Sequence, residues 1–151
     1  MINYFLCVNS FFYLIALSAG LFMSIMDLVA IEANGNLRPV VFFKTRQVTY
    51  VVFNMCIVVM FICIVACFIL TGNMVYFNAI AMALICYVYN WLIFMPNNDR
   101  LCFLETYEEE DYSRKEHNHL IIRWSCLQAI KIFMVSATYL FVSMAKVPTE
   151  Q

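Results

Sequence analysis

Four long apolar runs divide this chain, and their lengths limit what it can fold into more than any other feature. The runs cover residues 4–31, 48–70, 74–94 and 120–144. As a helix, each is long enough to cross a hydrocarbon core of about 30 Å. We therefore predict an all-α integral membrane protein whose four transmembrane helices form an antiparallel bundle.

Composition supports this prediction and excludes other classes of protein. Of the 151 residues, 64% are hydrophobic and 13% are charged, so the segments between the runs are too small for a soluble core. We expect a single polytopic membrane domain, 1–151, with the lipid bilayer as its surroundings. The net charge of −1 argues against a nucleic-acid partner, which requires a dense basic surface.

The basic residues predict the orientation of the chain in the membrane. Four crossings bring two connections to one face, and seven of the nine Lys and Arg residues lie in or beside them: Arg38, Lys44, Arg46, Arg100, Arg114, Lys115 and Arg123. The positive-inside rule places this face in the cytosol, together with an acidic segment between the third and fourth helices. Both termini then face the lumen or the exterior. Residues 16–19 could be a signal-peptidase site, but no basic segment precedes the first run, so we expect that run to remain as a span.

Small residues and a short turn predict how the helices pack. Ala16, Gly20 and Ser24 follow one another at intervals of four on the first helix, which allows a second helix to approach closely. We expect this seam to serve packing within one chain rather than a dimer. The turn at 71–73 contains Gly and Asn and is so short that the second and third helices must be antiparallel neighbours.

Two charged residues, Asp27 and Lys131, lie inside the runs. A charge in the bilayer is costly and usually finds a partner or faces water. Both residues fall in the cytosolic half of their helices at comparable depths. We predict an ion pair between the first and fourth helices. The alternative is that each side chain extends separately to the cytosolic headgroups.

No arrangement typical of catalysis is present. Six of the seven cysteines fall inside the apolar runs without zinc-site spacing, and we expect free thiols. His117 and His119 would point apart on a helix, and no third metal ligand stands at a fixed spacing. There is no Gly-rich phosphate loop and no nucleophile–histidine arrangement at one membrane depth. We predict a protein that is not an enzyme and has no metal or cofactor.

Several short motifs resemble the cornichon family of small four-helix membrane proteins. Asp27-Leu28 stands where that family closes its first span, residues 70–73 and 76–78 resemble its turn between the second and third spans, and Asp99 fits the residue that opens its cytosolic motif. The resemblance covers nearly the whole chain. The sequence departs from the family by lacking the turn proline and the tryptophan of the second span.

The resemblance implies a membrane adaptor: a cargo receptor for vesicle-mediated export from the endoplasmic reticulum to the Golgi, or an auxiliary subunit of AMPA-type glutamate receptors. It implies client membrane proteins and the COPII coat as partners, and residence in the endoplasmic reticulum and Golgi or the plasma membrane. Tyr4, Phe5 and Phe12 would contact client helices. The segment that would bind the coat is Phe103, Leu104, Glu105, Thr106 and Tyr107.

Two other classes of protein fit the same sequence. One is a small bacterial or viral multi-pass protein, such as an immunity protein or a subunit of a membrane complex, which would place the chain in the bacterial inner membrane if the source is bacterial. The other is a homo-oligomeric pore in which Asp27 and Lys131 would line water. The source organism would separate the first of these from the cornichon reading.

Overall fold

The computed structural model is all-helical in the part of the chain that it describes, residues 1–32, 39–106 and 114–145. Side chains are described for residues 1–29, 45–101 and 118–145. The elements are α1 (Ile2–Glu32), α2 (Pro39–Thr71), α3 (Met74–Tyr89), the π-helical turn η1 (Asn90–Phe94), α4 (Met95–Thr106) and α5 (Arg114–Met144). The segments 33–38, 107–113 and 146–151, which include Tyr107 and the acidic segment, lie outside the described residues.

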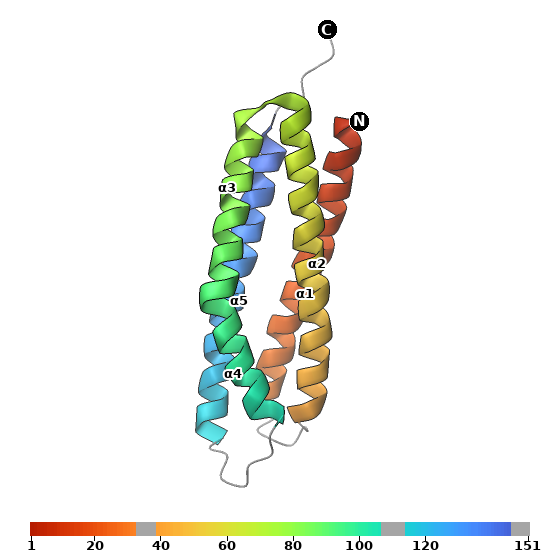
Figure 1. The fold of residues 1–151 in the computed structure, drawn as a ribbon. Coiled ribbons are helices and arrows are strands. Elements are labelled where there is room, and N and C mark those ends of the chain that lie inside the picture. The colour runs from red at the N-terminus through yellow and green to blue at the C-terminus, as the bar shows by residue number, and fades with distance from the viewer. Residues whose placement is uncertain (33–38, 107–113, 146–151) are drawn as a thin grey trace.

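Four helical segments are long and apolar enough to cross a membrane, which confirms the prediction of a four-span, all-α membrane protein. The spans are Ile2–Val29, Thr45–Thr71, Met74–Leu101 and Asn118–Met144. Large apolar side chains are exposed along all four spans, as expected of helices that face lipid. Figure 1 shows that the start of α1, the end of α5 and the turn between α2 and α3 lie at the same end of the molecule.

The third span is longer than the sequence predicted. The third apolar run ends at residue 94, two residues before Pro96, and we expected the span to end there as well. Instead η1 joins α3 to α4 without a break, because the N–H of Met95 bonds to the carbonyl oxygen of Asn90, five residues back. A π turn is one of the ways in which a helix accommodates an irregular hydrogen-bond ladder, such as the one that a proline without an N–H creates. α4 then packs against α2 and α5 and buries Leu101.

Gly20 lies where α1 meets two other helices. A Cβ at this position would lie 2.7 Å from Cδ1 of Ile132 on α5 and 3.2 Å from Cε2 of Phe53 on α2. Ala16 is fully buried on the same side of α1. The predicted small-residue seam therefore does serve close packing within the chain. Because lipid is as apolar as the helix surfaces, such close contacts contribute more to helix association than hydrophobic burial does.

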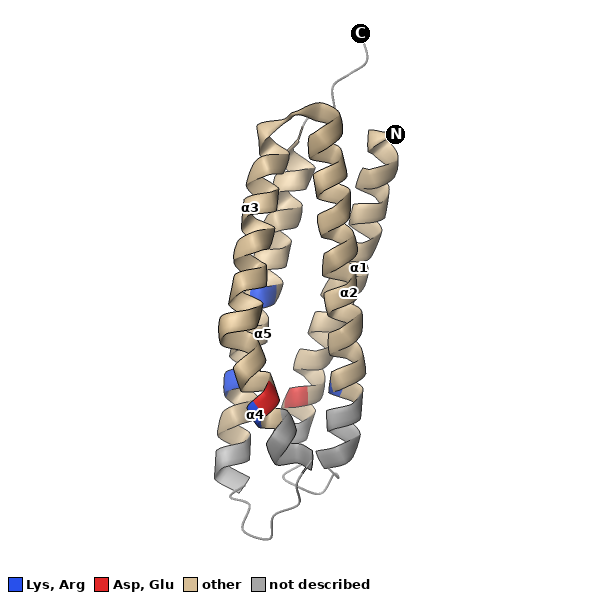
Figure 2. Cartoon of the chain, in the orientation of Figure 1, with Lys and Arg blue, Asp and Glu red and all other residues tan. Residues whose placement is uncertain are grey.

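Two apolar clusters fill the interior along the bundle. The larger one contains Phe53, Phe94 and Trp124, and the smaller one, which includes Tyr76, contains residues near both ends of the chain. Figure 2 shows that the charged residues of the described part gather toward the end of the bundle away from the termini, with one basic position further along α5. Charge is thus concentrated where the spans end, with an exception inside the membrane.

Candidate functional site: a lateral cavity within the membrane span

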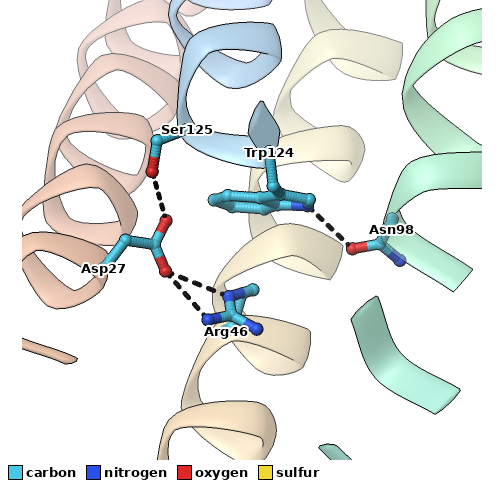
Figure 3. Close-up of polar contacts among 5 residues, drawn as sticks. All are labelled: Asp27, Arg46, Asn98, Trp124 and Ser125. Atoms are coloured by element: carbon cyan, nitrogen blue, oxygen red, sulfur yellow. Dashed lines mark hydrogen bonds and ion pairs between the residues drawn. The ribbon is translucent and has the colours of Figure 1, made fainter. Parts of the chain in front are cut away.

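Asp27 forms an ion pair with Arg46 at the end of the bundle (Figure 3). Nη2 of Arg46 lies 2.9 Å from Oδ1 of Asp27, and Nε donates to the same oxygen at 3.1 Å. The hydroxyl of Ser125 on α5 donates to Oδ2 of Asp27 at 3.1 Å. Both charged side chains are buried, and both residues lie within two positions of the end of their spans.

The same level of the bundle is closed by Trp124 and Asn98. The guanidinium of Arg46 stands 5.2 Å from the centre of the Trp124 ring, and Nε1 of Trp124 donates to Oδ1 of Asn98 on α4 at 3.1 Å. We call Asp27, Arg46, Asn98, Trp124 and Ser125 the paired cluster. It joins α1, α2, α4 and α5, so it draws on all four spans.

The predicted pair between Asp27 and Lys131 is wrong. Asp27 lies level with Ser125, and Lys131 is six residues further along α5, about 9 Å at the rise of a helix. The closer cation is Arg46, which was expected to lie in the cytosolic connection because it falls outside the second apolar run, 48–70. α2 instead begins at Pro39, so Arg46 lies two turns inside a helix and faces the interior. The predicted comparable depth of Asp27 and Lys131 is therefore wrong, and position along the chain could not identify which cation faces Asp27.

Lys131 lies at the centre of the Asn118–Met144 span, thirteen residues from either end and therefore about 20 Å from each. It is 1% exposed. Its ammonium donates to Oδ1 of Asn54 on α2 at 2.8 Å and to Oδ1 of Asn90 in η1 at 2.6 Å. The rings of Tyr50, Phe53 and Phe94 surround it, with centres 4.8–4.9 Å from Nζ.

The two asparagines are oriented by further hydrogen bonds. Nδ2 of Asn54 donates to the carbonyl oxygen of Tyr50, which fixes Oδ1 on the side of Lys131. The hydroxyl of Tyr50 has two acceptors within reach of its one hydrogen, Oδ1 of Asn90 at 3.3 Å and the sulfur of Met95 at 3.0 Å. Among the described residues, every hydrogen-bond partner of the ammonium is neutral. The charge of Lys131 is therefore solvated by amides and rings but is not neutralised there by a carboxylate.

A cavity of about 300 Å³ adjoins this ammonium, between α2 and the α3–η1 segment. Its interior is formed by Lys131, Asn54, Asn90, Tyr50 and Cys86. Its rim is formed by Val58 on α2 and by Tyr87 and Trp91 on the other side. These three rim side chains are 54%, 61% and 54% exposed, so the cavity opens sideways, toward lipid. We call it the lateral cavity.

The rim places two hydrogen-bond donors where lipid offers no acceptor. Tyr87 is at the centre of the Met74–Leu101 span, and Trp91 follows it by one turn. The two rings contact each other edge to face. In the described part of the chain, neither the hydroxyl of Tyr87 nor Nε1 of Trp91 forms a hydrogen bond. Tyr and Trp are usually enriched at the membrane interfaces, where water and headgroups satisfy their polar atoms, and the middle of a span is not such a place.

The remaining predicted site residues divide into described and undescribed ones. Tyr4 is 68% exposed, whereas Phe5 and Phe12 are half-buried and pack against the smaller and the larger apolar cluster. Phe103, Leu104, Glu105 and Thr106 belong to α4, but their side chains lie outside those described. The six cysteines that are described are free thiols, and no group of three potential metal ligands occurs within the described ranges.

Sequence reasoning missed the lateral cavity, although it noted its polar residues. From the sequence alone, Asn54 and Asn90 suggest only hydrogen bonds between helices, and Lys131 was predicted to pair with Asp27. The apolar runs give no signal that would group these residues, because Asn54, Asn90 and Lys131 lie six, four and eleven residues from the nearer end of their runs, which corresponds to different depths. Comparisons with protein-family models, curated proteins and solved structures found no match for this chain.

Proposed function

We propose that this protein is a membrane adaptor that binds client membrane proteins through its helices and catalyses no reaction. The observation that carries the proposal is the rim of the lateral cavity. Tyr87 and Trp91 expose hydrogen-bonding side chains at mid-span, beside an opening that leads to a buried ammonium. Polar groups facing hydrocarbon are costly, and contact with a second protein helix removes that cost.

An adaptor also fits what the rest of the described chain offers. Its exposed surface is apolar along four spans, so the surfaces available to a partner lie mostly within the bilayer. Helices associate there through close packing and hydrogen bonds, and the rim of the lateral cavity supplies both an uneven surface and donors. Tyr4, exposed near the start of α1, is a second place where a client helix could make contact.

The resemblance to cornichon proteins suggests a more specific function for this adaptor. In that case the four spans run antiparallel, both termini face the lumen, and residues 103–107 face the cytosol and bind the COPII coat. The protein then resides in the endoplasmic reticulum and Golgi and exports its client, or accompanies a receptor to the plasma membrane. The variant Phe103→Ala with Leu104→Ala is expected to retain a folded protein in the endoplasmic reticulum. Normal export of that variant would remove the coat-binding part and leave the adaptor proposal in place.

Photo-crosslinking in native membranes tests the adaptor proposal. A benzophenone amino acid replaces Trp91 on the rim or, as a matched control, Phe133, an exposed aromatic residue on α5 outside the cavity lining. We expect discrete protein adducts from position 91 that are absent from position 133. Lipid adducts alone from position 91, or the same products from both positions, would contradict the proposal.

A further inference from the structure

We propose that the lateral cavity receives a carboxylate side chain, Asp or Glu, from near the middle of a client transmembrane helix, and that this carboxylate pairs with Lys131. The inference rests on the proposed adaptor function and specifies the chemistry of the client. Within one molecule the two buried charge sites differ in this respect. Arg46 has its carboxylate in Asp27, and the described surroundings of Lys131 provide neutral acceptors.

Charge complementarity favours a carboxylate as the partner of Lys131. An ammonium has three N–H donors, and the amides of Asn54 and Asn90 accept two hydrogen bonds from it. Charged side chains inside a membrane usually pair with an opposite charge, and here the cavity leads from lipid to the ammonium. A carboxylate entering the cavity would accept the third hydrogen bond and neutralise the charge.

The depth of Lys131 in the membrane favours a partner that is itself a transmembrane helix. Lys131 is central in its span, and Tyr87 on the rim is central in the third span. A client carboxylate must therefore lie near the middle of its own span, about 20 Å from either end. An anionic lipid headgroup resides at the membrane surface and would have to leave it to reach this level. Depth therefore favours a side chain carried by a transmembrane helix over a lipid.

The volume of the lateral cavity fits a single side chain of a client helix. A volume of about 300 Å³ is at the lower end of ligand-binding cavities, so it suits one inserted side chain rather than an entire helix. The helix backbone would pack on the exposed rim, against Val58, Tyr87 and Trp91. Hydroxyl and indole donors on the rim could then bond to polar groups of the client helix.

The experiment uses the full-length protein in phosphatidylcholine vesicles with two labelled synthetic peptides. Both are polyleucine transmembrane helices, one with a central Glu and the other with Gln at the same position. Binding is measured by energy transfer. We expect the Glu peptide to bind about threefold to thirtyfold more tightly than the Gln peptide, the range that a polar contact between membrane helices provides.

Variants of the protein test whether Lys131 causes the preference for the Glu peptide. Lys131→Met should abolish the difference between the peptides, and Lys131→Arg should retain it. Val58→Trp, which fills the rim and leaves Lys131 in place, should weaken binding of the Glu peptide. Phe133→Leu, on the exposed side of α5, serves as the control and should change neither peptide's binding. Equal binding of both peptides to the unmodified protein, or no binding of either, would overturn the inference.

This result is separable from the adaptor proposal. Discrete protein adducts from position 91 together with equal peptide binding would keep the adaptor and reject the carboxylate. A preference for Glu that persists in Lys131→Met would place the contact elsewhere and also overturn the inference. Loss of the position-91 adducts would reject the adaptor function itself.

Discussion

The paired cluster and the lateral cavity both bury a cation between helices, and they differ in what surrounds it. Arg46 lies at the end of its span, bonded to the carboxylate of Asp27 and enclosed by residues from all four spans. Lys131 lies at mid-span, bonded to neutral amides beside a cavity that opens sideways. One buried cation therefore stabilises the contacts between helices, whereas the other lies where a second protein could bind it.

The largest expected effect is at the paired cluster. Arg46→Met removes a cation that pairs with the buried Asp27 carboxylate, and removing one member of a buried pair typically costs about 3–5 kcal/mol. We expect a corresponding loss of stability in SDS-driven unfolding in mixed micelles. The double variant Asp27→Asn with Arg46→Met should be less destabilised than Arg46→Met alone. Additive losses would show that the two residues stabilise the fold independently.

The packed surface of α1 around Gly20 and the exposed surface of α2 around Val58 should respond differently to a larger side chain. Gly20→Leu must displace Ile132 and Phe53, and overfilling a packed interior costs up to about 3 kcal/mol. Val58→Leu on the exposed rim should change stability by less than about 0.5 kcal/mol. The same unfolding assay measures both variants. Comparable losses would mean that the rim is as tightly packed as the seam.

Replacing Lys131 is expected to cost less stability than replacing Arg46 or filling the space beside Gly20. Lys131→Met removes the ammonium and leaves only neutral partners, of which Asn90 keeps a hydrogen bond from Tyr50 and Asn54 keeps one to the Tyr50 carbonyl oxygen. We therefore expect a loss of about 1 kcal/mol, from the contacts that are not replaced. A loss as large as that of Arg46→Met would make Lys131 a structural residue like Arg46 and remove the contrast between the two sites.

The sequence predicted the features that depend on length and composition. Run lengths predicted four spans, because the thickness of a bilayer fixes the number of apolar residues that a crossing needs. The spacing of Ala16, Gly20 and Ser24 predicted the seam, because small residues four apart fall on one helix face. Neither inference requires knowledge of how a helix is rotated about its axis.

The features that were missed depend on that rotation. Arg46 and Lys131 are both buried cations that the sequence offers as partners for Asp27. Lys131 lies about 9 Å too far along α5, and the rotation of α2 turns Arg46 toward the interior and Asp27. The third span was expected to end at residue 94, because the sequence does not reveal that a π turn carries the helix on through Pro96. The lateral cavity requires three elements to converge around one ammonium, which no pattern along a single helix encodes.

The two tryptophans of the chain allow one direct measurement, since Trp91 lies on the rim of the lateral cavity and Trp124 in the paired cluster. Single-tryptophan proteins, made with Trp124→Phe or Trp91→Phe, are placed in vesicles whose lipids carry bromine near the middle of the acyl chains. We expect strong quenching of Trp91, which is 54% exposed within the third span, and weak quenching of Trp124, which is buried. Equal quenching of the two, or a Trp91 shielded from bromine in the isolated protein, would contradict a cavity that opens toward lipid.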